Sequence, residues 1–212
     1  MDETWDVTVL LNINVISVKM KNCHGVVVTI NVKDIPIGAY GLDDMLPQYS
    51  PLLINTFGAM SRLTSLKSIS SLSIVIPKEA RSTLLYTAVE GFTSPEWRHL
   101  SQSLKNLGSL TVPLSLALLP MRVVLLSSSD YTMVCLRMKQ VFITTDIPDD
   151  KVHNKPLRRI TKFVEARYDA GFALSSLDAD FSVATPIHDQ AWADYIETWE
   201  SSVGEVSFSV QF

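Results

Sequence analysis

The alternation of apolar and polar residues near the start of the chain limits the fold most strongly. Within residues 5–20, positions 7 to 15 carry valine, leucine or isoleucine at every second position, with threonine or asparagine at most positions between them. A period of two residues is typical of a strand with one buried face. Residues 26–32 are rich in β-branched residues, and Gly25 before them suits a turn. The sequence therefore predicts an antiparallel hairpin of these two strands.

Further elements follow in an irregular order. Apolar residues at helical spacing behind a proline or a capping residue predict helices at residues 51–66, 94–107, 154–170 and 186–200. We expect further strands at residues 72–76, 82–89, 110–126, 131–144, 172–184 and 206–212. The serine-rich residues 127–129, followed by Asp130, favour a hairpin between the third and fourth of these strands.

Neither a regular alternation of strands and helices, nor an internal repeat, nor a domain linker is evident in this pattern. The predicted fold class is therefore α+β, with a mainly antiparallel sheet and about four helices. A length of 212 residues suits one substantial core, so we expect a single compact domain over residues 1–212.

The composition favours contacts in which the chain buries apolar surface against other copies of itself or against partner molecules. Apolar residues make up 47% of the chain and charged residues 19%, against about 25% charged residues in ordinary soluble domains. A chain so poor in charge has to bury much apolar surface within itself or against another molecule. We therefore expect a homo-oligomer.

The sequence indicates an intracellular protein. No run of about 20 apolar residues could cross a bilayer, and the acidic start does not look like a signal peptide. Two cysteines, Cys23 and Cys135, are too few for a disulfide framework, so we expect free thiols in a reducing compartment. The expected protein is neither secreted nor transmembrane.

Catalytic and cofactor-binding motifs are missing from the sequence. It lacks the glycine-rich loops of nucleotide sites, a nucleophile elbow and a zinc-binding histidine pair. The four histidines are isolated, and the adjacent Cys23 and His24 would point to opposite faces of a strand. We expect no catalytic residue, no metal, no cofactor and no small-molecule substrate. An enzyme whose site residues meet only in space stays open as an alternative.

The most suggestive segment is a basic, amphipathic helix near residue 160. Six of the 18 lysines and arginines define what we call the basic face: Lys151, Lys155, Arg158, Arg159, Lys162 and Arg167. An apolar stripe accompanies it, formed by Leu157, Ile160, Phe163, Val164 and Tyr168. Such a helix can pack its stripe on the core and bind anionic membrane or nucleoprotein with its basic side. The alternative is a solvated surface helix.

Two further features favour contacts between copies. All 18 basic residues and 14 acids lie in residues 1–168 (18 − 14 = +4), whereas residues 169–212 hold the other 8 acids and have a net charge of −8. Such a split can favour head-to-tail contacts. The long loop 34–51 also carries apolar residues that would reach a neighbouring copy, which we call the self-association loop: Leu42, Met45, Leu46 and Tyr49.

The order of these elements resembles that of rhabdovirus matrix proteins over residues 30–184. A β-rich start leads to the proline-headed helix at 50–66, and the strand at 133–144 precedes an acidic turn and the basic helix. The resemblance implies a structural virion protein that self-associates and binds membrane or nucleocapsid, located in the host cytoplasm or the virion interior. The chain departs from the family because it lacks a lysine-rich N-terminal tail and a Pro-Pro-x-Tyr motif. A small adaptor or virulence factor that binds one host protein is the second alternative.

Overall fold

The structure is a computed structural model, and it describes residues 4–12, 15–33, 54–56, 58–60, 62, 68–76, 95–113, 135–144, 154–182 and 189–211. The chain divides into two compact units, residues 1–107 (unit 1) and residues 108–212 (unit 2). Both units combine strands with helices, so the mixed α and β content is confirmed. A single domain over residues 1–212 stays a prediction.

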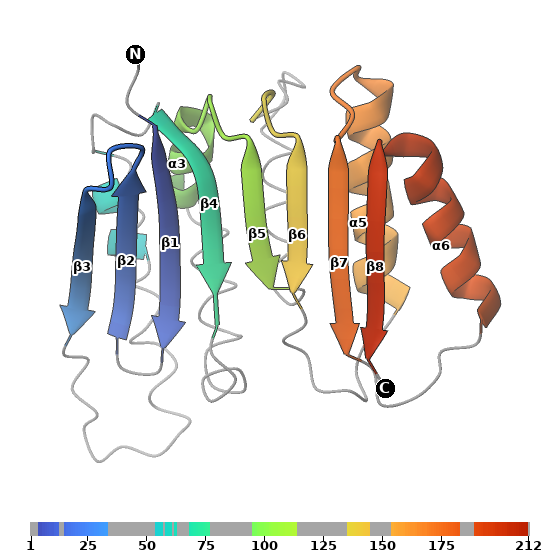
Figure 1. Ribbon diagram of the computed structural model, residues 1–212, viewed down its shortest axis with the longest axis horizontal. Coiled ribbons are helices and arrows are strands. Elements are labelled where there is room, and N and C mark those ends of the chain that lie inside the picture. The colour runs from blue at the N-terminus through green and yellow to red at the C-terminus, as the bar shows by residue number, and fades with distance from the viewer. Residues whose placement is uncertain are drawn as a thin grey trace. The chain divides into compact units, whose positions relative to one another are not determined.

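Unit 1 contains a four-stranded sheet in the order β3-β2-β1-β4 (Figure 1). Strand β1 (Trp5–Asn12) pairs antiparallel with β2 (Val15–Asn22), which pairs antiparallel with β3 (Val27–Lys33). Strand β4 (Ile69–Val75) runs parallel to β1 on its other side. The antiparallel pairing that we predicted therefore applies to the first three strands.

The predicted strand 5–20 is wrong, because the chain reverses direction within it. Asn12 of β1 pairs with Val15 of β2, which leaves a connection of two residues, as in a tight hairpin. The buried positions also change phase there, from odd residue numbers such as Leu11 to even ones such as Ile16. The predicted turn before β3 is confirmed. Gly25 has a φ of 81°, and the Asn22 Oδ1 accepts hydrogen bonds from the backbone N–H groups of His24 and Val26, at 3.1 and 2.7 Å.

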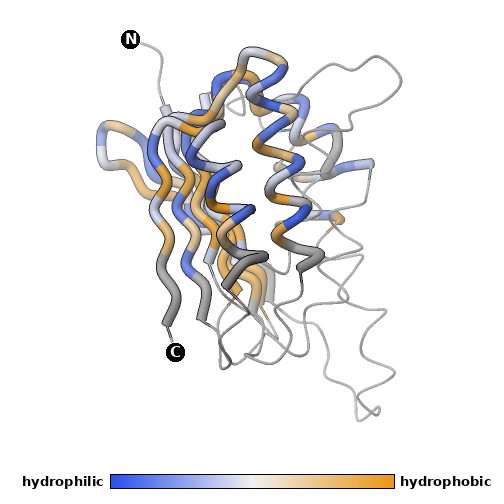
Figure 2. Tube along the Cα trace, turned by 90° about the vertical axis from the view of Figure 1, so that its right-hand side faces the viewer, coloured by the Kyte–Doolittle hydropathy of each residue, from blue (hydrophilic) through white to orange (hydrophobic). Residues whose placement is uncertain are grey.

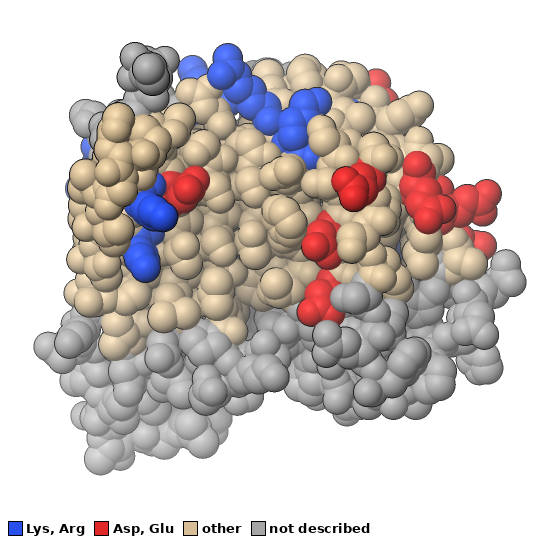
Figure 3. Space-filling view, viewed as in Figure 1, with Lys and Arg blue, Asp and Glu red and all other residues tan. Residues whose placement is uncertain are grey.

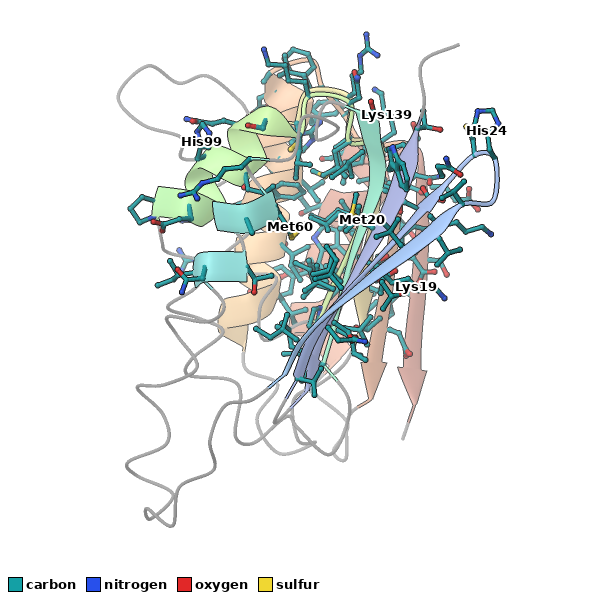
Figure 4. All side chains as sticks on the ribbon, turned by 90° about the vertical axis from the view of Figure 1, so that its left-hand side faces the viewer. Lys19, Met20, His24, Met60, His99 and Lys139 are labelled. Atoms are coloured by element: carbon teal, nitrogen blue, oxygen red, sulfur yellow. The ribbon has the colours of Figure 1, made fainter. Side chains whose placement is uncertain are left out.

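One face of the unit 1 sheet carries the core. Helix α3 (Pro95–Ser103) and the helical residues 54–56 and 58–60 lie on this face (Figure 4). Met20 and Met60 lie between sheet and helices, whereas Lys19 points away from the opposite face. Helix α3 begins at a proline, as predicted, and the core residues of the unit include Val7, Val9, Leu11, Ile16, Val18, Met20, Leu72, Ile74, Leu100 and Leu104.

Unit 2 contains four parallel strands in sequential order (Figure 1): β5 (Ser109–Pro113), β6 (Gln140–Thr144), β7 (Ser176–Ser182) and β8 (Glu205–Gln211). Helix α5 (Asn154–Asp169) connects β6 to β7, and α6 (Asp189–Ser202) connects β7 to β8. Both helices lie on the same side of the strands (Figure 2), as right-handed crossovers in one direction require.

Parallel pairing in unit 2 corrects two predictions. A mainly antiparallel sheet is wrong for this unit, and so is the hairpin between residues 110–126 and 131–144, because β5 and β6 run parallel. Parallel strands need a crossover connection and cannot be joined by a tight turn. We predicted no regular alternation of strands and helices, but strands and helices alternate from β6 to β8.

The four strands of unit 2 also share a short sequence pattern that we did not predict. Each repeat has an apolar residue two positions before a strand and two more at alternate positions inside it. In unit 2 the three positions are Leu107 (the last residue of unit 1), Leu110 and Val112; Met138, Val141 and Ile143; Leu174, Leu177 and Ala179; and Val203, Val206 and Phe208. All but Val206 and Phe208, which are half-buried, lie in the core. Repeats of one strand and one helix that stack in order are typical of solenoids.

Candidate binding surfaces

Helix α5 forms where the amphipathic pattern predicts it. Leu157, Ile160, Phe163 and Val164 of the apolar stripe are buried against the sheet. Tyr168 does not belong to this stripe, because 54% of its surface is exposed. The helix ends before Gly171, whose φ of 78° stops helical continuation, as predicted.

The basic face is smaller than the sequence suggests. Arg158 and Lys162 are exposed on α5, one helical turn apart. The next exposed charged positions along the helix are Glu165 and Asp169, so the sign of the charge reverses within two turns. Lys155 and Arg159 belong to α5, but their side chains lie outside the described residues, as does all of Lys151. Among the side chains of α5 that the structure describes, the basic surface therefore consists of Arg158 and Lys162.

Arg167 does not lie on the basic face, and this part of the prediction is wrong. Its side chain is completely buried. The guanidinium donates hydrogen bonds to the backbone carbonyls of Met138 at 3.0 Å, Phe172 at 3.2 Å and Cys135 at 3.4 Å, and it lies 5.9 Å from the centre of the Phe163 ring. Burial lowers the pKa of this guanidinium. Arg167 therefore ties the segment before β6 to the end of α5.

The two thiols differ in their surroundings. Burial raises the pKa of the Cys135 thiol from 9.0 to about 12, against the opposing effect of the nearby Arg167, so it is protonated near neutral pH and a poor nucleophile. Cys23 is exposed, and no disulfide joins either cysteine to another within the described residues. No group of histidine, cysteine or acidic residues within the described ranges could hold a metal ion. His24 and His99 lie far apart in Figure 4.

The self-association loop falls outside the described residues, together with Leu42, Met45, Leu46 and Tyr49. A different apolar surface, which we did not predict, is present in unit 1. Val26, Val27, Val28 and Ile30 are 41–50% exposed, although all but Val26 belong to strand β3. Among the described strands, β3 pairs only with β2. The signal was available, because residues 26–30 are all β-branched and no charge precedes Lys33 in the strand, which is unusual for a sheet edge.

Charge is distributed unevenly over the helix-free faces of the two sheets (Figure 3). Basic side chains lie over β2 and at the upper ends of β5 and β6, whereas acidic ones gather over β7, β8 and α6. The residues of opposite charge are Lys19 and Lys21 in unit 1, and Asp178, Asp180 and Glu205 in unit 2. The acidic C-terminal region that the sequence predicts therefore contributes to the surface of a sheet as well as to α6.

Parallel strands also bring their carboxyl ends to one edge of the sheet, where α/β proteins usually bind ligands. At this edge of unit 2 the chain continues from Pro113, Thr144 and Ser182 into residues outside the described ranges. None of the described helices is both long enough and apolar enough to cross a bilayer. Comparison of the chain with protein-family models, characterised proteins and solved structures finds no match.

Proposed function

We propose that this chain is a non-enzymatic structural protein that works by self-association inside the cell or the virion. The apolar edge strand β3 carries this proposal. Val27, Val28 and Ile30 are 49%, 41% and 44% exposed on a strand whose outer edge has no partner among the described strands. Fully burying an exposed aliphatic side chain of this size contributes about 1.5–3 kcal/mol, and these side chains, which are about half-buried already, would each contribute about half as much. The backbone groups of an unpaired edge also favour pairing with another strand.

The test of self-association is sedimentation velocity over a concentration series. The unmodified protein should form oligomers as its concentration rises, and Ile30→Lys should weaken this association about tenfold or more, because a charge would enter the contact. Leu136→Lys is the matched control, since Leu136 is also 44% exposed but belongs to unit 2 and not to β3. A protein that stays monomeric at every concentration contradicts the proposal. Equal weakening by both variants would show a general effect of charge.

The proposal has a second part, in which the exposed basic residues of α5 bind an anionic membrane or nucleocapsid, as the resemblance to matrix proteins implies. Arg158 and Lys162 support it, because both are exposed on one side of the helix. Replacing both with glutamate should abolish binding to vesicles that contain phosphatidylserine, and rising salt should weaken binding by the unmodified protein. The control is Glu165→Gln, which removes a negative charge on the same helix. Binding that survives the double substitution would contradict this part.

The repeat architecture favours a second candidate function, that of an adaptor for one partner protein. Solenoids of strand–helix repeats often bind partners on an extended face of their sheet, and the described helices of unit 2, α5 and α6, cover the same face (Figure 2). An adaptor would stay monomeric and ignore vesicles in the experiments above. An enzyme with a site at the carboxyl edge of unit 2 is the remaining alternative, supported only by the general position of sites in parallel sheets.

A further inference from the structure

Strands β3 and β8 are the outer strands of their own sheets within the described part of the chain. Strand β3 pairs only with β2, and β8 pairs only with β7. Both strands are seven residues long. Each therefore has one free edge of backbone N–H and C=O groups, which is a template for pairing with another strand.

The handedness of each sheet fixes how these two edges can join. In Figure 1 the helices of each unit lie behind its strands, and the arrows of β3 and β8 point down. In this orientation β3 is the left edge of unit 1, and β8 is the right edge of unit 2. A left and a right edge continue into one sheet, with the helices on the same side, only when the two strands run parallel. A β3 strand joined to a second β3 strand would instead run antiparallel.

The side chains of the two strands match in the parallel register that pairs all seven residues. Met20 faces the core and pairs with Val28, so Val28 and Ile30 lie on the helix side of β3. Phe208 contacts Trp199 of α6, with ring centres 6.3 Å apart, so Val206 and Phe208 lie on the helix side of β8. The register places Val28 beside Val206 and Ile30 beside Phe208. On the other face, it places the polar Thr29 beside Ser207.

Charge selects β8 as the partner of β3. Lys21 pairs with Val27, and the register places Val27 beside Glu205 of the second copy. Lys21 and Glu205 would then be two strands apart, about 10 Å at the backbone, a gap that their long side chains can close. In the next row Lys19 pairs with Thr29, and Ser207 of the second copy pairs with Asp178. A β3–β3 contact would instead bring the lysines of both copies together.

We propose that β3 of one copy pairs in parallel with β8 of a second copy, which joins the two sheets head to tail. This inference rests on the proposed self-association and names its partner strand. The contact is heterologous, so the dimer still has one unpaired edge of each kind, β8 on one copy and β3 on the other, and assembly can continue beyond a dimer. A single strand pair buries little area, so the association should depend strongly on concentration.

Disulfide trapping tests the register directly. In a Cys23→Ser background, Thr29→Cys and Ser207→Cys are made in separate proteins and mixed under mild oxidation. Neighbouring strands bring paired residues within the 4.4–6.8 Å that a disulfide spans, so the mixture should give a crosslinked dimer, whereas each protein alone should not. Ser201→Cys, exposed on α6, replaces Ser207→Cys in the control mixture and should give at least tenfold less dimer. Self-crosslinking of the Thr29→Cys protein would reveal a β3–β3 contact and overturn the proposal.

A charge exchange tests the selection of β8. Lys21→Glu and Glu205→Lys should each weaken association about two- to fivefold, as exposed ion pairs do, and a chain with both changes should recover it. Lack of recovery, or no crosslink in the mixture, overturns this inference. The unmodified protein is followed by sedimentation velocity in parallel. Oligomers without the crosslink refute only the β3–β8 contact, whereas a monomer at every concentration refutes self-association as well.

Discussion

The indole Nε1 of Trp199 in α6 donates a hydrogen bond of 2.8 Å to the hydroxyl oxygen of Thr161 in α5. Both side chains are buried, and the Thr161 hydroxyl in turn donates to the carbonyl of Leu157 at 3.0 Å. The bond satisfies the one polar atom of the largest buried side chain in the described ranges. It therefore fixes how the two helices of unit 2 meet above the sheet.

Thr161→Val tests this bond, because valine has nearly the same shape but no acceptor. The indole N–H would stay buried without a partner, which costs about 1–3 kcal/mol. The free energy of unfolding, measured by urea denaturation, should fall by this amount. Thr198→Val is the control, since the Thr198 hydroxyl makes the same kind of bond to the carbonyl four residues earlier, at 2.9 Å, but accepts none from an indole. Equal losses in both variants would show that the local helix bond matters and that the Trp199 contact does not.

Arg167→Met should destabilise the protein by about 3 kcal/mol, because buried carbonyls would lose charged donors. The carbonyls are those of Cys135, Met138 and Phe172. Arg158→Met on the exposed side of α5 should change the free energy of unfolding by less than about 0.5 kcal/mol. Vesicle binding by folded Arg167→Met protein should be unchanged. A loss of binding without a loss of stability would return Arg167 to the basic face.

Local patterns predicted individual elements well. Helix α5 has its apolar residues at helical spacing and a stop at Gly171, and β3 follows a turn at Gly25, as the residue types alone indicate. Pairing between strands was harder to predict. The apolar run around Leu110 allowed either a hairpin or a crossover, and only contacts between distant segments decide between them.

The candidate surfaces were predicted less well for a related reason. Arg167 lies nine residues after Arg158, which is half a turn around the helix, and seven residues after the buried Ile160, so helical spacing places it in the apolar stripe. We assigned it to the basic face by its charge. Its burial depends on carbonyls that come from a different segment, such as that of Met138. The exposure of Ile30 depends on which strand occupies the edge, and this order is a property of the whole sheet.

Gly204→Ala should destabilise unit 2, although alanine is only one methyl group larger. A Cβ atom at Gly204 would lie 2.9 Å from the carbonyl oxygen of Ser175, a backbone atom that cannot move without disturbing the start of β7. We expect a loss of about 1–3 kcal/mol in the free energy of unfolding. Gly58→Ala is the contrasting variant, because the added atom would lie 3.5 Å from the Glu96 Cγ, an ordinary contact, in a helical segment. It should stabilise the protein by about 0.5–1 kcal/mol. The same sign of change for both variants would contradict this interpretation of the two sites.

The Cys135 thiol should make stability depend on pH in the alkaline range. Its folded pKa, raised by burial from 9.0 to about 12, means that the folded protein keeps a proton which the unfolded chain loses above pH 9. The unfolded state binds fewer protons in this window, so the free energy of unfolding contributed by this group is intact below pH 9 and falls as pH rises toward 12, by up to about 1.4 kcal/mol per pH unit. Urea denaturation of the unmodified protein and of Cys135→Ala at pH 8 and pH 10.5 separates this contribution from other titrating groups. The unmodified protein should lose more stability than the variant over this interval. A parallel decline of both would mean that the Cys135 thiol ionises as readily in the folded protein as in the unfolded chain.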